Sequence, residues 1–343
     1  MKILLGMSGG LDSTYAALKL KNESHEVLGI VLQMHKYTET DAAKEAAESV
    51  GIPLRILDLS ERFEKIVIEN FVSEYLKART PNPCTICNSE VKFRALYDYA
   101  IENGFDKIAT GHYAEIVEIK DELGIRYAVK RGKDLKKDQS YMLWRLPQQI
   151  LSKLIFPLAN EEKKDVRETA GRENLSVAER PESQEICFVP SGDYAAYIEE
   201  RGFESLPGDF IDSNGKVLGR HNGIIRYTVG QRKGLGVAYG TRIFVTDINP
   251  ENNTITLSPE DKYSNEFSVS GMVFSGIREP MENEEICLDV KIRYAAPPIP
   301  ARILYLGGGR AKVKTESPIR AVTPGQSAVF YVKDVLACGG YID

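Results

Sequence analysis

The order of apolar segments predicts an α/β protein with a doubly wound, mostly parallel sheet, followed by two small β-rich domains, the last a β-barrel. Up to about residue 110, short apolar runs typical of buried strands alternate with amphipathic helical stretches. Beyond about residue 190 the helical periodicity fades, and short alternating segments with glycine turns follow. We therefore expect three domains, over 1–190, 191–268 and 269–343.

Strands and helices are expected to alternate in the first domain. Its strands are predicted at 3–7, 27–32, 54–57 and 107–110. Its helices are predicted at 14–20, 42–50, 63–72 and 93–101. Gly51 and Gly104 are suited to end two of these helices. Ligands of such sheets bind beyond the carboxyl ends of the strands, so Gly6, Leu32 and Gly111 are expected to share one pocket.

A hairpin, one more helix and many short strands are expected after the sheet. The hairpin is predicted over 114–119 and 125–130, and Asn160 is predicted to cap a helix that opens with Glu161. Strands of the second domain are predicted at 208–211, 223–228, 242–248 and 254–257. Strands of the barrel are predicted at 288–294, 301–305, 311–314 and 328–332.

The composition is that of a soluble globular protein. Hydrophobic residues make up 43% of the chain, and no apolar run approaches the roughly 18–20 residues of a membrane span. The amino-terminal apolar run is too short for a signal peptide, so we expect a cytoplasmic protein with no membrane partner. Five cysteines are too few for a disulfide scaffold. The net charge of −5 gives no global signal for nucleic acid, so an RNA partner requires local basic patches.

A glycine turn follows the first predicted strand. Ser8-Gly9-Gly10-Leu11-Asp12-Ser13 lies between this strand and the first helix, where backbone N–H groups and the helix terminus can bind an anion. The hydroxyls of Ser8 and Ser13 can donate to phosphate oxygens. A Walker loop would end in Gly-Lys-Ser or Gly-Lys-Thr, and no lysine is present here. The pattern instead resembles the PP-loop of ATP pyrophosphatases, which cleave ATP between the α and β phosphates and adenylate a substrate oxygen; an ordinary glycine turn is the alternative.

Two cysteines lie in a stiff loop, Pro81-Asn82-Pro83-Cys84-Thr85-Ile86-Cys87-Asn88. Asn88 or Ser89 is predicted to cap the following helix, which would place Cys87 beside a helix N-terminus. A free thiol has a pKa near ~8.5, and a helix terminus contributes about 0.3–1 kcal/mol, less than one pKa unit. A base, a metal or the substrate must therefore help to activate Cys87. The alternative is a structural zinc knuckle, which would need two more ligands.

A third cysteine and several long motifs make a family resemblance specific. Cys187 lies in I-C-F at 186–188. The other motifs are G-M-S-G-G-L-D-S at 6–13, T-P-N-P-x-x-x-C-N at 80–88, A-T-G-H-Y-A at 109–114, K-D-Q-S-Y at 137–141, Y-T-V-G-Q-R-K-G-L-G at 227–236 and A-V-T-P-G-Q-S-A-V-F-Y at 321–331. Together they resemble the tRNA-specific 2-thiouridylase family, also called the MnmA family, over nearly the whole chain.

This resemblance implies an enzyme, a sulfurtransferase that acts on tRNA in the anticodon loop. Members use ATP, with Mg²⁺, to adenylate the O2 of the wobble uridine and replace it with sulfur from a cysteine persulfide, which a donor protein supplies. Cys87 would be the nucleophile beside the target base and Cys187 would carry the persulfide, in a chemistry that includes a disulfide bond. ATP would be held by Gly6, Met7, Ser8, Gly9, Gly10, Leu11, Asp12, Ser13, Leu32 and Gly111.

The resemblance also assigns residues to tRNA. The target base would face Asn82, Pro83 and Cys84. Further tRNA contacts would come from Lys137, Asp138, Gln139, Arg293 and Tyr294. Basic runs at 130–137 and 291–320, with a basic glycine loop at 230–236, suit an RNA backbone, although charge runs are commonly just solvated faces. An anticodon loop also exposes its bases at less cost than a duplex does.

One residue departs from the family pattern. Common members have aspartate where this chain has Cys84. The three thiols of Cys84, Cys87 and Cys187 could therefore hold a 4Fe–4S cluster with one iron open to sulfide, as an alternative to the persulfide route. His112 is either a catalytic base or a residue that supports the ATP pocket. A different PP-loop ligase and a non-catalytic RNA-binding protein are the remaining alternatives.

Overall fold

The first part of the chain is built on a five-stranded parallel sheet, here described from a computed structural model that places all residues except 122–123, 174, 176 and 179–185. The strand order is β3-β2-β1-β4-β7. The strands are β1 (Lys2–Gly6), β2 (Glu26–Gln33), β3 (Leu54–Asp58), β4 (Lys107–Thr110) and β7 (Leu154–Ile155). All four strand pairs are parallel, which confirms the predicted doubly wound sheet.

Helices cover both faces of this sheet because consecutive β1 side chains point to opposite faces. Ile3 and Leu5 pack with Ala16, Ala17, Ala46 and Ala47, which come from α1 (Leu11–Asn22) and α2 (Thr40–Val50). Leu4 packs on the other face against Phe93 and Leu96 of α6 (Phe93–Glu102). Gly51 ends α2 in the left-handed conformation with φ 70°, as its position predicted.

The cysteine loop differs from its prediction. The helix begins at Pro83, where proline is favoured because its missing N–H has no intrahelical partner at that position. It then runs without interruption through α5 (Pro83–Ile86), a π-helical turn η2 (Cys87–Lys92) and α6. The expectation that Asn88 or Ser89 caps the helix, with Cys87 beside its N-terminus, is therefore wrong. Cys87 lies one turn inside the helix, where a terminus no longer exerts its charge.

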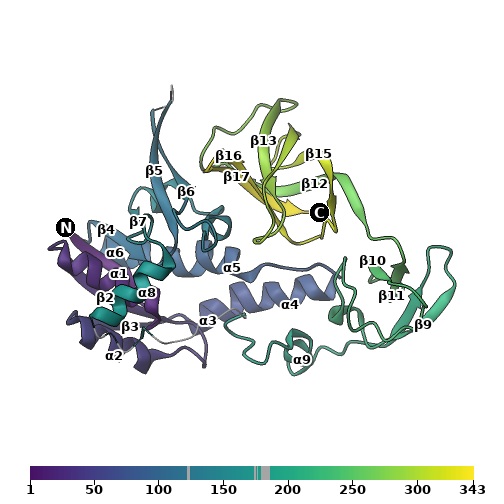
Figure 1. Cartoon of the computed structure of the whole chain (residues 1–343), viewed down its shortest axis with the longest axis horizontal. Coiled ribbons are helices and arrows are strands. Elements are labelled where there is room, and N and C mark those ends of the chain that lie inside the picture. Colours follow the sequence, from purple (N-terminus) through teal and green to yellow (C-terminus); the bar gives the residue numbers. More distant parts are fainter. Residues whose placement is uncertain (122–123, 174, 176, 179–185) are drawn as a thin grey trace.

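A second interrupted helix runs along the molecule toward the small β domain (Figure 1). It consists of α3 (Ser60–Phe63), a π-helical turn η1 (Glu64–Ile68) and α4 (Glu69–Leu76). Phe63, Phe71 and Phe188 pack edge to face beside it. Because Phe188 directly follows Cys187, this aromatic cluster fixes the backbone next to the third cysteine.

The predicted hairpin is present after the parallel sheet, and it joins the sheet of the barrel. Its strands are β5 (Ala114–Asp121) and β6 (Gly124–Arg131), and β6 pairs with the last strand of the barrel at Lys130 and Val335. The following segment, η3 (Ser140–Leu143) and Trp144, is buried between the first domain and the barrel. The indole of Trp144 donates to Ser327 Oγ at 3.0 Å. The hairpin region therefore joins the first domain to the barrel.

Helix α8 (Lys163–Arg172) begins later than the sequence suggests. The predicted cap is Asn160, but the N-cap position is Glu162, and its side chain makes no capping bond. The backbone N–H of Lys163 instead donates to Asp134 Oδ2 at 3.1 Å, so a distant carboxylate satisfies the start of this helix. A local capping pattern cannot reveal such a partner. The short helix α7 (Gln148–Leu151) precedes β7.

The second part of the chain is a small four-stranded sheet in the order β10-β11-β8-β9. Its strands are β8 (Gly208–Ile211), β9 (Val217–His221), β10 (Phe244–Asn249) and β11 (Thr254–Ser258). The strand predicted at 223–228 is wrong, because Gly223 adopts φ 104° and the chain turns through η4 (Ile224–Arg226). A short helix, α9 (Tyr194–Glu199), precedes the sheet, and β9 was not predicted.

The third part is a closed six-stranded β-barrel, which confirms the predicted architecture. Its strands are β12 (Tyr263–Val273), β13 (Glu285–Lys291), β14 (Ile299–Tyr305), β15 (Ala311–Arg320), β16 (Ser327–Val332) and β17 (Val335–Ile342). Pairing between β12 and β17 closes the barrel. The two strands that close the barrel, β12 and β17, were not predicted from the sequence. Alternating inward side chains such as Ala311, Val313 and Thr315 fill its interior.

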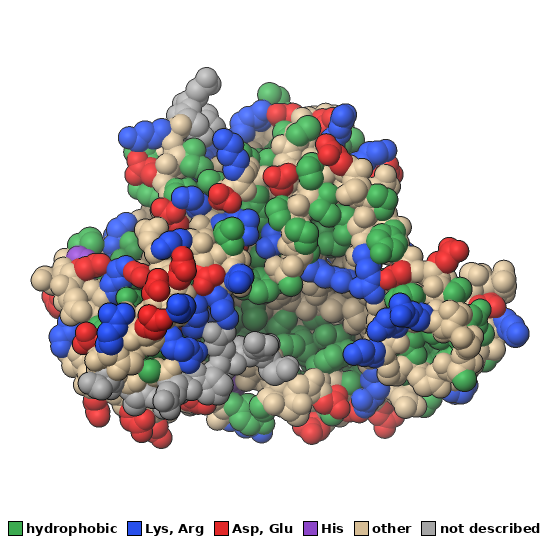
Figure 2. Space-filling view, viewed as in Figure 1, with side chains coloured by type: hydrophobic (Ala, Val, Ile, Leu, Met, Phe, Trp, Pro, Cys, Tyr) green, Lys and Arg blue, Asp and Glu red, His purple; other side chains and the backbone are tan. Residues whose placement is uncertain are grey.

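The three parts surround a hollow. Figure 1 places the parallel sheet at one end, the small β domain at the other and the barrel above the helices that join them. Figure 2 shows hydrophobic side chains on the floor of this hollow and lysine and arginine side chains along its rim. None of the helices in the described part of the chain is long and apolar enough to cross a membrane.

Candidate active site

The glycine turn after β1 forms a loop that is held by its own hydroxyl groups. Ser13 Oγ donates to the carbonyl of Gly10 at 3.1 Å and accepts from the N–H of Ser8 at 3.2 Å. It also lies 3.2 Å from Ser8 Oγ. Thr14 Oγ1 donates to the same Gly10 carbonyl at 2.9 Å. These bonds fix the backbone of the loop over α1, where N–H groups can bind phosphate oxygens.

Glycine is required at two places around this loop because backbone atoms approach closely. Gly9 has φ 78°, and a Cβ there would lie 2.6 Å from the backbone nitrogen of Ala43. A Cβ on Gly111 would lie 2.7 Å from the carbonyl carbon of Asp12. The segment after β4 therefore packs directly on the loop, and a side chain at either glycine would displace it.

The three strand ends that were expected to share a pocket are neighbours. In the strand order, β1 lies between β2 and β4, and Gly6 pairs with both Ile30 and Thr110. Gly111 directly follows Thr110, and Leu32 lies two residues beyond Ile30. The residues predicted for ATP therefore meet at the carboxyl edge of the sheet, the usual ligand position of this architecture.

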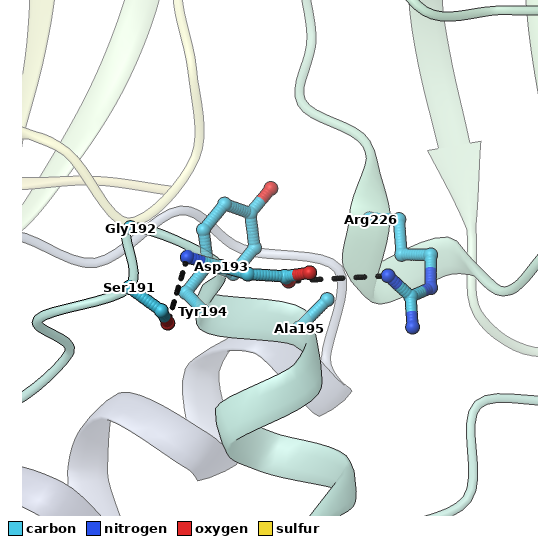
Figure 3. Close-up of a pocket in the computed structure, with 6 residues that line it drawn as sticks. All are labelled: Ser191, Gly192, Asp193, Tyr194, Ala195 and Arg226. Atoms are coloured by element: carbon cyan, nitrogen blue, oxygen red, sulfur yellow. Dashed lines mark hydrogen bonds and ion pairs between the residues drawn. The ribbon is translucent and has the colours of Figure 1, made fainter.

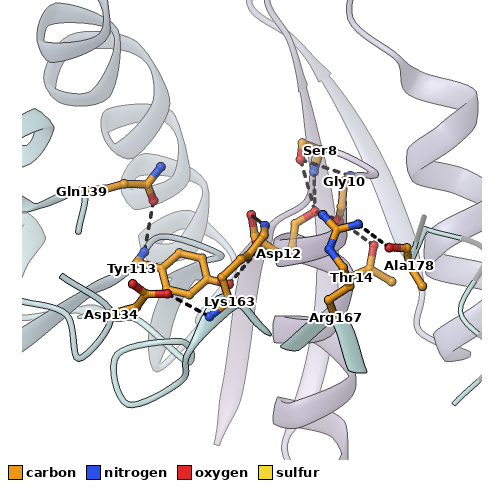
Figure 4. A network of polar contacts seen from close by, with 11 residues as sticks. Ser8, Gly10, Asp12, Thr14, Tyr113, Asp134, Gln139, Lys163, Arg167 and Ala178 are labelled. Atoms are coloured by element: carbon orange, nitrogen blue, oxygen red, sulfur yellow. Dashed lines mark hydrogen bonds and ion pairs between the residues drawn. The ribbon is translucent and has the colours of Figure 1, made fainter. Parts of the chain in front are cut away.

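Asp12 in the loop is held by two side chains that the sequence did not single out. Lys163 Nζ lies 2.6 and 2.7 Å from the two carboxylate oxygens of Asp12. The hydroxyl of Tyr113 donates to Asp12 Oδ1 at 2.9 Å. Figure 4 shows both groups converging on Asp12. The neighbouring Gln139 accepts from the N–H of Tyr113 at 3.1 Å, so the tyrosine is itself fixed.

The cysteines of the helical loop differ in exposure. Cys84 is exposed, whereas Cys87 is buried and its Sγ lies 3.7 Å from Met34 Sδ. Burial raises the pKa of Cys87 to about 12, and the positive charge of Lys92 opposes this shift. Desolvation also raises the pKa of Cys84, and the positive charge of Lys92 opposes this shift. Both groups are therefore thiols at neutral pH.

Cys187 belongs to the same environment although it is distant in sequence. Desolvation raises the pKa of Cys187, and the charge of Cys84 raises it further. Cys84 and Cys187 in turn both raise the pKa of Cys87. The structure thus brings the three predicted cysteines together. All five cysteines of the chain are free thiols, including Cys287 and Cys338 in the barrel.

Lys92 is the charge that these groups share. It is the last residue of η2, and a π-helical turn brings it back toward the side of Cys87, the first residue. Its positive charge lowers the pKa of all three cysteines and of His112. Lys92 was not predicted from the sequence, because a single lysine in an amphipathic helix carries no distinctive signal.

His112 lies among aromatic rings rather than in a polar site. Its Nδ1 is 2.7 Å from Thr110 Oγ1, and Phe93 and Phe156 flank the ring at 5.5 and 5.9 Å. Burial lowers the pKa of His112 to about 3, so the ring is neutral at physiological pH. A histidine with such low basicity is a poor general base, and these contacts favour the interpretation that it supports the ATP pocket.

The geometry of the thiols bears on the iron–sulfur alternative. Among the described residues, no group of three or more histidine, cysteine or acidic side chains is placed to hold a metal ion. Cys87 contacts a methionine sulfur within an apolar cluster that includes Ile86, Val91 and Phe188. The iron–sulfur alternative therefore stays a prediction, and the iron content of the purified protein tests it.

The residues that the resemblance assigned to tRNA differ in accessibility. The amide of Asn82 donates to Met142 Sδ at 3.4 Å, and Pro83 is buried at the start of α5. Asp138 is 3% exposed and accepts from Ser140 and Arg131. These bonds use the Asp138 carboxylate to hold the 131–140 segment in place. Lys137 and Gln139 flank it, and both are partly accessible.

Arg293 and Tyr294 lie in the barrel, just after β13. Arg293 Nη2 donates to the carbonyl of Ala321 at 2.8 Å, and the ring of Tyr294 lies 6.3 Å from that of Tyr141. Desolvation lowers the pKa of Arg293 from its usual value. The barrel also contacts the cysteine loop, because Gln326 donates to the carbonyl of Thr80 at 2.8 Å.

The basic runs are partly neutralised by local acidic residues. Lys130 pairs with Glu115 at 2.8 Å and Arg131 with Asp138 at 3.1 Å. On the barrel, Lys314 pairs with Glu266 at 2.7 Å, and Arg320 pairs with Asp261. A count of charges along the sequence therefore overstates the basic surface that is available to RNA.

A small polar cavity of about 380 Å³ lies a few residues after Cys187 (Figure 3). It is lined by Ser191, Gly192, Asp193, Tyr194, Ala195 and Arg226. Asp193 accepts from the N–H of Ala196 at 2.9 Å, and Arg226 lies 3.9 Å from Asp193. These internal contacts order the connection to the small β domain.

The parallel sheet, the glycine loop at its carboxyl edge and the helices on both faces define a doubly wound α/β domain, with three cysteines close to the loop. Residues 1–191 match a family described as the tRNA methyl transferase HUP domain. Residues 195–259 match a tRNA methyl transferase PRC-barrel domain, and residues 264–342 match an aminomethyltransferase beta-barrel domain.

Curated relatives match the whole chain. A tRNA-specific 2-thiouridylase MnmA of Carboxydothermus hydrogenoformans is 43% identical over 360 residues, covering 100% of this chain and 97% of the relative. The tRNA-specific 2-thiouridylase MnmA 1 of Caldanaerobacter subterraneus is 44% identical over 359 residues, covering 100% and 98%. The chain belongs to this family of tRNA-specific 2-thiouridylases, which are sulfurtransferases. A 4-thiouridine synthetase solved with RNA and bound ATP aligns at TM-score 0.36 and 16% identity, over 58% of this chain and 50% of that one.

Proposed function

We propose that this protein uses ATP to replace the 2-oxygen of a wobble uridine in tRNA with sulfur. One observation supports this most directly. The end of strand β2 connects the glycine loop with the cysteines. Leu32 lies at the edge of the sheet where the glycine loop is. Met34 follows two residues later, and its Sδ lies 3.7 Å from Cys87 Sγ. Two extended residues span about 7 Å, so an activated uridine can reach both the phosphate loop and a thiol.

In the first step the uridine O2 attacks the α-phosphate of ATP. The bond between the α and β phosphates breaks, and pyrophosphate leaves. The N–H groups and hydroxyls of the Ser8–Ser13 loop support this step because they would hold the phosphates in a fixed orientation. Gly9 and Gly111 support this role indirectly, because a Cβ at either position would meet the backbone of Ala43 or Asp12 and displace the loop.

Mg²⁺ fits the donor set at the loop. The carboxylate of Asp12 is a hard oxygen donor beside the expected phosphate position; because Lys163 already pairs with both of its oxygens, the phosphate oxygens of ATP would be the main ligands. When bound, Mg²⁺ neutralises charge on the phosphates. Asp12 itself would orient the metal, while Tyr113 keeps the carboxylate in place.

In the second step sulfur replaces the activated oxygen. The outer sulfur of a Cys187 persulfide attacks C2, the C2–oxygen bond breaks, and AMP leaves with that oxygen. Cys87 then attacks the Cys187 sulfur, which breaks the sulfur–sulfur bond and leaves the outer sulfur on uridine. The two electrons come from the two cysteine sulfurs, so a Cys87–Cys187 disulfide forms and an external thiol must reduce it. Cys84 would then face the base without a redox role.

The partners follow from this chemistry. A tRNA would occupy the hollow in Figure 2, where lysine and arginine side chains line the rim. A donor protein would load Cys187, whose exposure permits a protein–protein transfer. We assign the catalytic domain to 1–190, the central domain to 191–268 and the barrel to 269–343, and we place the protein in the cytoplasm.

The proposal is tested by measuring pyrophosphate release and 2-thiouridine together in one reaction with purified protein, ATP, tRNA and a persulfide donor. Both products should require tRNA and ATP. Pyrophosphate with a different acceptor would indicate another PP-loop ligase. Binding of tRNA without pyrophosphate would indicate an RNA-binding protein without this activity.

A further inference from the structure

The phosphate loop lacks a positive charge in its own sequence. Between Gly6 and Leu18 the only charged side chain is that of Asp12, and it is acidic. A loop of this charge faces the anionic end of ATP at a disadvantage, because like charges at short range repel. Loops of the Walker type solve this problem with an internal lysine. The compensating cation of this chain must therefore come from another segment.

Lys163 supplies a positive charge beside the loop. Its Nζ contacts both oxygens of Asp12 at 2.6 and 2.7 Å, and its side chain is only 11% exposed. It enters the site from α8, more than one hundred residues away in sequence (Figure 4). The ammonium neutralises Asp12 and places a positive charge at the N-terminal turn of α1.

The position of Lys163 is enforced by the fold. Its backbone N–H is bonded to Asp134, and Val166 and Ala170 of the same helix are buried in the core that includes α1. Its neighbour Lys164 provides a contrast, because that side chain is 81% exposed and pairs with Glu168 of its own helix. Helix α8 thus directs one lysine into the phosphate loop and the next one into solvent.

We propose that Lys163 binds the pyrophosphate end of ATP and the pyrophosphate product. This inference rests on the proposed function. An ammonium carries three donors, so it can contact a β- or γ-phosphate oxygen while remaining close to Asp12. Asp12 thereby keeps the lysine extended toward the nucleotide. Lys163 stabilises the leaving group as its negative charge develops.

The ratio of the affinities for ATP and AMP tests this assignment, because AMP lacks the phosphates that Lys163 is assigned to bind. Dissociation constants for ATP, AMP and pyrophosphate are measured by calorimetry on the full chain and on Lys163→Met. We expect ATP and pyrophosphate to bind about 10- to 100-fold more weakly to the variant, the range of one charge-assisted hydrogen bond. The affinity for AMP should change less than threefold, on the order of RT.

Lys164→Met is the matched control, since it removes the same charge from the adjacent position without reaching the loop. It should leave all three affinities unchanged. Lys163→Arg should retain most of the ATP preference, because it keeps the charge. If Lys163→Met does not fold, Lys163→Gln decides by the same ratio.

The outcomes separate this inference from the proposed function. An equal loss of ATP and AMP affinity in Lys163→Met, or no loss, would overturn the role of Lys163 while leaving the thiouridylase proposal intact. Failure of the unaltered protein to bind ATP would overturn both, because no nucleotide would then occupy the loop. A selective loss of ATP and pyrophosphate affinity supports the assignment.

Discussion

The phosphate loop and the cysteine cluster are adjacent, but they are built in opposite ways. The loop is made by six consecutive residues whose hydroxyls and backbone bond to one another. The cysteines come from segments about one hundred residues apart, and apolar contacts hold Cys87. The loop is therefore preorganised for its ligand, whereas the thiols depend on how distant parts of the chain pack.

The difference extends to reactivity. On the proposed function, the loop needs no chemical change before it binds phosphate. Burial raises the pKa of Cys87 to about 12, so the group is a thiol at neutral pH. A buried thiol with a raised pKa is less open to oxidation and alkylation than an exposed one. Adenylation and sulfur transfer should accordingly be separable by mutation.

The largest expected effect is a complete separation of the two activities in Cys87→Ser. We expect this variant to lose 2-thiouridine formation and to keep pyrophosphate release within about threefold, because the serine is nearly isosteric and does not touch the loop. Mass spectrometry of tRNA digests and a pyrophosphate assay measure the two products. Cys287→Ser, an exposed cysteine on the barrel, should retain both activities.

Asp12→Ala is the reciprocal variant. It should lose tRNA-dependent pyrophosphate release, and with it thiolation, while its circular dichroism spectrum stays that of the folded protein. Near-normal release from folded Asp12→Ala would contradict the assignment of the phosphate loop.

Cys84→Ser distinguishes the persulfide route from the iron–sulfur route. On the persulfide route we expect substantial thiolation to remain, because Cys84 faces the base without taking part in electron transfer. Anaerobically purified protein should contain no stoichiometric iron and show no iron–sulfur absorption. Loss of iron and activity together in Cys84→Ser, Cys87→Ser and Cys187→Ser would instead establish a cluster on these thiols.

A smaller effect is expected from the basic run. Replacing Lys136 and Lys137 with alanine should flatten the plot of log tRNA affinity against log salt, by about 0.7–0.9 for each RNA phosphate that the variant no longer neutralises. Lys44→Ala is the control, since that residue lies on α2 and already pairs with Asp41. An unchanged slope would show that the run is only a solvated surface.

The smallest effect concerns stability rather than activity. The unfolded chain protonates His112 near pH 6.5, but the folded chain does so only near pH 3, because burial disfavours the charged ring. Stability should therefore fall as the pH is lowered from 6.5. In His112→Gln the melting temperature should fall less between pH 7 and pH 5 than in the unaltered protein. An equal fall would mean that the ring titrates normally.

Local patterns predicted the parallel sheet, its ligand edge and the glycine loop. Strand β4 and the end of α2 at Gly51 followed from apolar periodicity and a left-handed glycine. Lys163 and Lys92 could not be found this way, because their roles depend on which helix packs against which loop. The same limit explains why Asn160 was wrongly predicted as a helix cap. The first N–H group of that helix donates to Asp134, which is distant in sequence. The cysteines were found through motifs, but the burial of Cys87 was visible only in the fold.

On the proposed function, the protein cleaves one ATP between its α and β phosphates for each sulfur that it transfers to uridine. The most direct measurement is the molar ratio of AMP, pyrophosphate and 2-thiouridine in one timed reaction of the purified protein with tRNA and a persulfide donor. We expect equal amounts of all three products, and none without tRNA. Release of ADP and phosphate, or 2-thiouridine formed without ATP, would contradict it.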